Sequence, residues 1–410
     1  MADAASTADE RNVITLTAIA GFSARFFEVM YPTLAVSMAW DLRLPIEQVI
    51  GWSFFGYLLL GLGVIPASFL ADRVGLRRAL VVAMAGAGVS ALAAAEASPG
   101  TGIAACLGAI GLFGSICHPA GMPLISQAAT VPVRALKISG ISGNLAVAVT
   151  PALIAVLCSQ FGWQTAWAIV GFVMCAVAAL CPFLSVEDGP EDPPIATETA
   201  ESAADVEGSV PLLLFGLLCT TAMLAGISYR ANLLVQPAYF AERVPTVGFG
   251  IATSLVLACG VLGQYGGAAL TGRYELRWLY WGAHAIGLPA LLAMATMAGL
   301  PMIAAAILFT VSSFAVQPIE QSLFARFTPG RWRKASGRIQ FLLHFAVGSV
   351  AVALLACGQA RGDLRVVLFY LAGAVTVVLA VMSIFVACSG SRTIRKARTR
   401  WAMNGGPRGA

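Results

Sequence analysis

Charged residues are scarce in this chain. Of its 410 residues, 11% are charged and 59% are hydrophobic, whereas soluble proteins average about 25% charged residues. This deficit argues against a soluble fold and indicates that lipid is the main solvent. Many apolar stretches reach the ~20 residues that a helix needs to cross a bilayer. The net charge of +5 is then a signal of membrane topology, and we expect no nucleic-acid partner.

Motifs for metals, nucleotides and cofactors are also missing. The nine cysteines lie mostly in apolar runs without a CxxC pair or a Cys/His cluster, so they are interpreted as small hydrophobic residues. The sequence has no P-loop, no GxGxxG between a strand and a helix, and no HExxH. We therefore expect no cofactor, no metal and no enzymatic activity. The polar, acidic first ten residues argue against a cleavable signal peptide.

Hydrophobic segments predict twelve transmembrane helices in an all-α polytopic membrane protein. The predicted spans are residues 13–39, 48–71, 78–97, 101–127, 136–159, 163–184, 210–240, 248–271, 278–298, 300–325, 337–359 and 364–388. An acidic stretch rich in Pro, Ala and Ser, residues 185–209, is expected to be a flexible linker. It separates an N-terminal six-helix half (1–184) from a C-terminal six-helix half (210–390), which precedes a basic tail (391–410).

Basic residues predict the orientation of these spans. The loops after spans 2, 4, 8 and 10 and the segment after span 12 hold Arg73, Arg77, Arg78, Arg134, Lys137, Arg273, Arg277, Arg326, Arg331, Arg333, Lys334, Arg338, Arg392, Arg395, Lys396, Arg398 and Arg400. The opposite loops hold only Arg43, Arg243, Arg361 and Arg365. Because positively charged loops stay in the cytoplasm, we expect both termini and the linker there, and a bacterial inner membrane as the location.

The two halves repeat one another. The pattern G-x-S-x-R-x6-P occurs at residues 21–32 and again at 226–237. The loop arginines at 73 and 77 recur at 273 and 277, and the Lys-x-Ser-Gly at 137–140 recurs at 334–337. These matches keep their order along the chain, so a duplicated six-helix unit is predicted. Parallel repeats of this kind are typical of one large transporter class.

Ionisable residues lie inside the predicted spans, where a charge costs at least ~2.5–3.5 kcal/mol. Arg25 and Glu28 are on span 1, His118 on span 4, Arg230 on span 7 and Glu320 on span 10. Such residues normally face a partner or a watery cavity. Arg25 and Glu28, three residues apart, share a helix face. They are either an internal ion pair or a titrating acid with a cation that tunes it or binds an anion.

Amides and histidines accompany these charges. Asn144 lies on span 5, Gln317 beside Glu320 on span 10, and Gln340 and His344 share a face of span 11. Hydrogen bonding between helices is the alternative role for the amides, and it is equally open for His118. Since a histidine titrates near neutral pH, His118 is also a candidate for binding solute or protons. His284 on span 9 is expected at the cytoplasmic interface.

Residues 66–78, PASFLADRVGLRR, resemble the loop-2/3 signature of the major facilitator superfamily, with Ala67 in place of its first glycine. The resemblance covers the whole chain and implies a central cavity lined by spans 1, 4, 7 and 10. It also implies that this loop acts as a conformational latch, formed by Asp72, Arg73, Gly75, Arg77 and Arg78. Asp72 is expected to cap the following helix and to pair with arginines of the neighbouring loop.

Within the superfamily, residues 117–121 (CHPAG) and 140–145 (GISGNL) resemble the fosmidomycin-resistance-type transporters. Thr150-Pro151 partly resembles the end of the antiporter motif, although the glycines that usually follow are absent at residues 152–154. The resemblance implies proton-coupled efflux.

The leading hypothesis is secondary active transport of a small anionic or zwitterionic solute by alternating access. The residues predicted to bind the solute are Arg25, His118, Asn144, Arg230, Gln317, Gln340 and His344, and those predicted to carry protons are Glu28, Glu320 and His118. Proton-driven efflux is expected; uptake by symport and a non-transporting receptor or scaffold are the alternatives. The expected partners are the solute, protons and the lipid bilayer, with the chain acting as a monomer.

Overall fold

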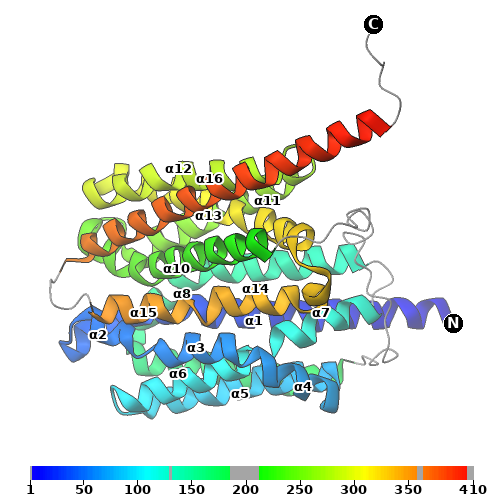
Figure 1. The fold of residues 1–410 in the computed structure, drawn as a ribbon. Coiled ribbons are helices and arrows are strands. Elements are labelled where there is room, and N and C mark those ends of the chain that lie inside the picture. The colour runs from blue at the N-terminus through cyan, green and yellow to red at the C-terminus, as the bar shows by residue number, and fades with distance from the viewer. Residues whose placement is uncertain (1, 129–131, 185–211, 358–362, 404–410) are drawn as a thin grey trace, which may run out of the picture.

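The computed structural model describes residues 2–128, 132–184, 212–357 and 363–403. Within these ranges the chain forms α-helices and short 3-10 helices and has no strand. The long helices lie side by side in one bundle (Figure 1). The all-α prediction is thus confirmed, while the predicted linker, residues 185–209, lies outside the described residues.

The N-terminal half follows the predicted spans closely. Its helices are α1 (Ala2–Leu42), α2 (Ile46–Gly51), α3 (Phe54–Leu62), α4 (Val64–Val74), α5 (Leu76–Glu96), α6 (Thr101–Gly114), α7 (Cys117–Ala128) and α8 (Pro132–Leu180), followed by a 3-10 helix at Cys181–Phe183. The second span is divided among α2, α3 and α4, and the fourth between α6 and α7. The sequence predicted each of these spans as a continuous helix.

The helix α8 contains two spans. Its residue Gly162 has φ 82° and ψ 163° and is not helical, a conformation that glycine adopts without the clash a side chain would cause. The chain turns there, between the predicted spans 136–159 and 163–184.

The C-terminal half has the same plan. Its helices are α10 (Leu212–Arg243), α11 (Phe249–Thr271), α12 (Leu276–Thr296), α13 (Gly299–Phe327), α14 (Ser336–Phe345), α15 (Gly348–Cys357) and α16 (Leu364–Met403), with a 3-10 helix at Gly330–Ala335 before α14. The predicted span 11 is interrupted between α14 and α15. The last helix, α16, continues through most of the predicted basic tail.

The described helices account for all twelve predicted spans. Ten helical segments are long and apolar enough to cross a membrane, and an eleventh, Ile46–Leu62 with Val64–Val74, is bent by 53°. One of the ten is α8, which Gly162 divides in two. The chain is therefore an integral membrane protein.

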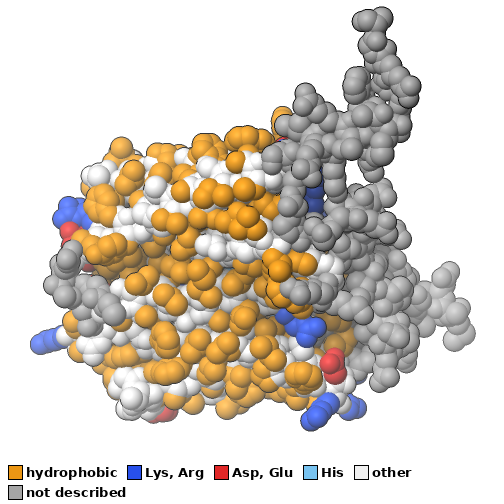
Figure 2. All heavy atoms as spheres, viewed as in Figure 1, with side chains coloured by type: hydrophobic (Ala, Val, Ile, Leu, Met, Phe, Trp, Pro, Cys, Tyr) orange, Lys and Arg blue, Asp and Glu red, His pale blue; other side chains and the backbone are white. Residues whose placement is uncertain are grey.

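The outer surface agrees with a lipid environment. Large apolar side chains such as Phe172 and Leu262 are each 70% exposed. Figure 2 shows hydrophobic side chains over the length of the bundle and charged side chains near its two ends. Because burial of such surface in water-excluding lipid is favourable, this surface fits the apolar core of a bilayer.

The two halves pack together at one end of the bundle and form separate cores at the other. One core cluster contains Leu34 and Met38 of α1 together with Phe240 of α10. We call the end where these two helices finish, at the left in Figure 1, the closed end. The clusters near the beginning of the same helices each belong to one half, and we call that end the open end.

Candidate functional site

A cavity of about 490 Å³ lies between the two halves. It extends from Glu28 and Arg230 toward Thr17 and Gly337 near the open end. Most predicted site residues line it: Arg25, Glu28, His118, Arg230, Gln317, Glu320, Gln340 and His344. They come from α1, α7, α10, α13 and α14, which belong to spans 1, 4, 7, 10 and 11, and residues of other spans complete the lining.

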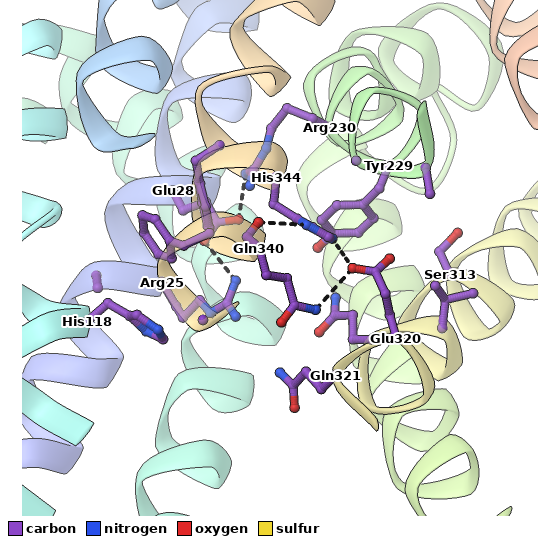
Figure 3. A pocket seen from close by; sticks show the side chains of 18 of the residues that line it. Arg25, Glu28, His118, Tyr229, Arg230, Ser313, Glu320, Gln321, Gln340 and His344 are labelled. Carbon is purple, nitrogen blue, oxygen red and sulfur yellow. Dashed lines mark hydrogen bonds and ion pairs between the residues drawn. The ribbon is translucent and has the colours of Figure 1, made fainter. Parts of the chain in front are cut away.

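Glu28 is the first charged centre of the cavity and bridges the halves. Its Oε2 accepts a hydrogen bond from Arg25 Nη1 at 2.9 Å, and its Oε1 accepts one from Arg230 Nη1 at 2.5 Å (Figure 3). The side chains of Glu28 and Arg230 are 4% and 3% exposed, whereas that of Arg25 is 41% exposed. One carboxylate between two guanidinium groups leaves a net charge of +1, and Arg25 presents it to the cavity.

Aromatic rings surround the guanidinium group of Arg230. Its central carbon lies 4.6 Å from the ring centre of Phe345, 5.0 Å from Tyr57 and 5.8 Å from Tyr229. A cation over an aromatic face is attracted by the negative face of the ring, more strongly where water is excluded. Since Tyr57 and Glu28 belong to the first half and Arg230 to the second, these contacts hold the halves together beside the cavity.

Glycines give both arginines their position. A Cβ atom on Gly143 would lie 3.3 Å from Cγ of Arg25, and one on Gly348 would lie 3.3 Å from Cγ of Arg230. The two glycines are 205 residues apart, as are the two arginines. Each half therefore packs its arginine stem against a glycine at the equivalent position, which gives the sequence repeat a structural counterpart.

Glu320 is the second charged centre and has neighbours of another kind. Tyr280 donates to its Oε2 at 3.1 Å and Gln340 Nε2 donates to its Oε1 at 3.0 Å. His344 Nε2 lies 3.4 Å from Oε1 (Figure 3), and Glu320 is fully buried. Arg230 is not one of these neighbours, because its guanidinium group is bound to Glu28.

A contact within its own helix orients the ring of His344. His344 Nδ1 is 3.2 Å from the carbonyl oxygen of Gln340, and a carbonyl only accepts. This contact suits a tautomer with the proton on Nδ1, and Nε2 is the nitrogen that faces Glu320. Glu320 and His344 thus form a carboxyl–imidazole pair with Nε2 and Oε1 3.4 Å apart.

His118 contacts the opposite half. Its ring stacks on that of Phe341, with centres 4.9 Å apart and an interplanar angle of 23°. Phe341 in turn stacks on Phe345 at 4.3 Å. Phe341 and Phe345 are on α14 with Gln340 and His344, so this short helix contacts His118, Arg230 and Glu320.

The structure does not bring every predicted residue into the cavity. Gln317 lines it from α13. Asn144, on α8, is half-buried and is not among the residues that line the cavity. A role for Asn144 in solute binding therefore has no contact to support it.

The predicted latch loop joins α4 to α5. Gly75 has φ 87° and ψ 148° and makes the turn between these helices, while Asp72, Arg73 and Arg78 are exposed. Arg77 Nη2 donates to the carbonyl oxygen of Pro182 at 2.6 Å, which ties the loop to the end of span 6.

The expected cap by Asp72 is wrong. The N-terminus of α5 has Gly75 at the capping position and no side-chain capping bond. The side chain of Arg134, on the neighbouring loop, lies outside the described residues, so the pairing of Asp72 with that loop and the latch itself stay predictions.

Sequence reasoning missed several aromatic and histidine side chains of the site. His284 was expected at the interface, but it is 7% exposed and lines the cavity beside Tyr280. Tyr57 and Tyr229 were not among the predicted site residues. A signal was present for His284: the chain has three histidines, and the other two had been recognised as cavity residues.

These features define a polytopic membrane protein whose two helical halves enclose a cavity with ionised and titratable side chains. Such a site suits binding of a small charged solute and exchange of protons. Within the described residues, no group of three or more His, Cys, Asp or Glu side chains is placed to hold a metal ion.

The chain belongs to the Major Facilitator Superfamily, whose sequence profile matches residues 13–352. It is therefore a membrane transporter by family. No curated protein sequence matches it significantly, and the finer resemblance to fosmidomycin-resistance-type transporters is not confirmed.

Solved transporter structures share this fold. A bacterial homolog of the human lysosomal transporter Spinster, crystallised in an inward-facing and occupied conformation, has a TM-score of 0.72 at 13% identity, with 92% of this chain and 97% of that chain covered. A POT family transporter in complex with 5-aminolevulinic acid has a TM-score of 0.73 at 12% identity, with 92% and 96% covered. A mutant of the nucleoside transporter NupG has a TM-score of 0.72 at 13% identity, with 91% and 99% covered.

Proposed function

We propose that this chain is a proton-coupled secondary transporter for a small anionic or zwitterionic solute, working by alternating access. The observation that carries the proposal is the net charge of +1 on the Arg25–Glu28–Arg230 cluster inside a cavity between two halves. An intramembrane charge of this kind is costly, and by default it marks a binding or transport site. The two separate cores at the open end and the shared core at the closed end fit one state of an alternating cycle.

Arg25 is the residue that we assign to the anionic group of the solute. Its side chain is 41% exposed, and the bond to Glu28 occupies only Nη1. A guanidinium group presents several donors in a plane and suits a carboxylate, phosphate or phosphonate. Arg230, 3% exposed behind Glu28, supports the cluster from the second half.

The Glu320–His344 pair is the site that we assign to the coupled proton. Glu28 has two arginines that favour its ionised form, whereas Glu320 is fully buried among Tyr280, Gln340 and His344. Uptake of a proton by Glu320 would leave no arginine unpaired, whereas at Glu28 it would leave two. His118, whose ring is stacked on Phe341, is the lesser candidate.

The charge count favours movement of the anion together with a proton. With the Glu320–His344 pair unprotonated, its charge of −1 cancels the +1 of the arginine cluster. When the pair takes up one proton, the cavity returns to +1, so a bound anion neutralises it. Proton and anion therefore favour each other's binding, which is the requirement of symport. Export by antiport is the second candidate, favoured by the antiporter-like stretch that ends at Thr150-Pro151.

The test is solute-dependent proton flux in proteoliposomes with a pH-sensitive dye inside. Thermal shift first selects solutes from a panel of small carboxylates, amino acids and phosphonates, since a ligand at a hundred times its Kd stabilises by about 2.7 kcal/mol. Symport predicts that an inward solute gradient acidifies the lumen, and antiport predicts that it makes the lumen alkaline. A chain that binds a solute but moves neither solute nor protons would be a receptor or scaffold, contrary to the proposal.

A further inference from the structure

Four polar atoms near the closed end have no hydrogen-bond partner. They are Oγ1 of Thr33 on α1, and Oδ1 of Asn232 and both amide atoms of Gln236 on α10. The three residues are 0%, 4% and 1% exposed. An unpaired polar group inside a protein is rare and unfavourable. In Gln236, neither the side-chain nitrogen nor the oxygen is hydrogen-bonded. We therefore expect this amide to find a hydrogen-bond partner in another state of the protein.

Helix geometry places these groups at the contact between the halves. Val29 of α1 packs in one cluster with Leu233 of α10 and Val147 of α8. Thr33 follows Val29 by four residues and Gln236 follows Leu233 by three, so each lies one turn further along the same helix face. Both turns lie toward the closed end. Asn232 precedes Gln236 by four residues and therefore lies on the same face of α10.

We propose that Gln236, with Thr33 and Asn232, forms a second binding station for the solute, which opens when the halves part at the closed end. The station carries no charge, so it would hydrogen-bond the hydroxyl, amide or carbonyl groups of the solute and the water around them. The inference rests on the proposed function, because only alternating access opens this end. The Glu28–Arg230 ion pair lies between the station and the cavity, since Arg230 precedes Gln236 on α10.

The unpaired atoms also bias the conformational equilibrium. While the closed end is sealed they lack partners, and when it opens they gain water or solute. Each therefore raises the free energy of the sealed state relative to the open one. Replacing Gln236 by an apolar side chain of similar length removes that bias, so the sealed state becomes more populated.

Thiol accessibility tests whether the station opens. In proteoliposomes, Gln236→Cys is labelled with a membrane-impermeant maleimide added on the side of the closed end, and the unchanged protein measures the labelling of native cysteines. Val235→Cys is the matched control. Val235 is 1% exposed and lies four residues before Tyr239, whose hydroxyl donates to Met294 of α12 in the same half. We expect labelling at 236 to exceed that at 235 about tenfold or more, because only residue 236 faces the opening path.

A second pair of variants tests the energetic role. Gln236→Leu should raise the melting temperature and slow solute exchange by about tenfold. Gln264→Leu removes another unpaired glutamine oxygen, on α11 beside Gly263, which packs against Val311 of the same half. This control should change the melting temperature without slowing exchange.

The outcomes separate this inference from the proposed function. If solute exchange is measurable but residue 236 labels no faster than residue 235, the station is refuted while transport stands. Equal effects of the two leucine variants on exchange would refute the energetic role. If neither exchange nor labelling occurs, the proposed function fails and the station fails with it.

Discussion

The two buried carboxylates of the cavity are held in opposite ways. Glu28 is bound by the arginines of both halves, at 2.9 and 2.5 Å. Glu320 is bound by a tyrosine, an amide and a histidine, all from its own half. The first arrangement fixes a charge and joins the halves. The second arrangement contains no arginine and lies within one half.

This difference indicates that the two carboxylates have different roles in the same cavity. A residue that must stay ionised to neutralise two buried arginines is poorly suited to carry a proton, because losing its charge leaves both arginines unpaired. A residue with neutral neighbours and one histidine can change its charge at lower cost. Among the acids predicted for proton coupling, the geometry therefore favours Glu320 over Glu28.

The largest effect is expected from Glu28→Gln. This change leaves two guanidinium groups without their carboxylate, and removing one partner of a buried ion pair costs about 3–5 kcal/mol. We expect a lower melting temperature and loss of both proton-driven transport and solute exchange. Glu28→Asp, which keeps the charge, should recover part of both. A Glu28→Gln protein with normal stability and exchange would show that the cluster does not need its carboxylate.

A comparison of Arg25→Lys with Arg230→Lys comes next. Arg25 faces the cavity and Arg230 lies behind Glu28 among Tyr57 and Phe345. Losing a charge-assisted contact to the solute costs about 1.5–3 kcal/mol, so Arg25→Lys should weaken affinity roughly ten- to a hundredfold. Arg230→Lys should mainly lower the melting temperature. Calorimetry and thermal unfolding on both purified variants measure these quantities, and the reverse pattern would assign solute binding to Arg230.

Much of the fold could be predicted from the sequence because its signals are local. Apolar runs longer than a bilayer is thick determine the spans, and the repeated G-x-S-x-R pattern indicates the two halves. The interruptions at Gly63 in span 2, between α6 and α7, and between α14 and α15 were not predicted. Hydropathy reports whether a segment prefers lipid, and it does not report the direction of the backbone within it.

The site was predictable within each helix and much less so between helices. The three-residue spacing of Arg25 and Glu28 placed them on one face, and they form an ion pair. The four-residue spacing of Gln340 and His344 also placed them on one helix face, and both contact Glu320. The bond from Arg230 to Glu28 crosses 202 residues. Helical periodicity gives no sign of which helix faces which across the cavity.

An intermediate effect is expected from Glu320→Gln. Glutamine retains the size of the side chain and hydrogen-bonding atoms but cannot take up a proton, and no arginine of the cluster depends on it. Wild-type transport driven by a pH gradient should increase as the pH on the solute side falls, because the protonated pair favours the bound anion. In the variant, proton-driven accumulation should stop and the pH dependence should flatten, while solute exchange at equal pH continues. Retained proton-driven accumulation would instead assign the coupled proton to Glu28 or His118.

The smallest effect is expected from Tyr280→Phe. Tyr280 donates one hydrogen bond to Glu320 Oε2 at 3.1 Å, and a hydrogen bond of this kind contributes about 0.5–1.5 kcal/mol. A donor stabilises the ionised carboxylate more than the neutral acid, so its removal makes the Glu320–His344 pair easier to protonate. The midpoint of the pH dependence of transport should therefore move to higher pH, by up to about one pH unit.

Tyr239→Phe is the matched control for this variant, because its hydroxyl bonds to Met294 near the closed end and lies away from Glu320. That control should leave the midpoint unchanged. Equal midpoints in Tyr280→Phe and the wild type, with transport intact, would show that the tyrosine bond is structural and that the proton is held elsewhere in the cavity.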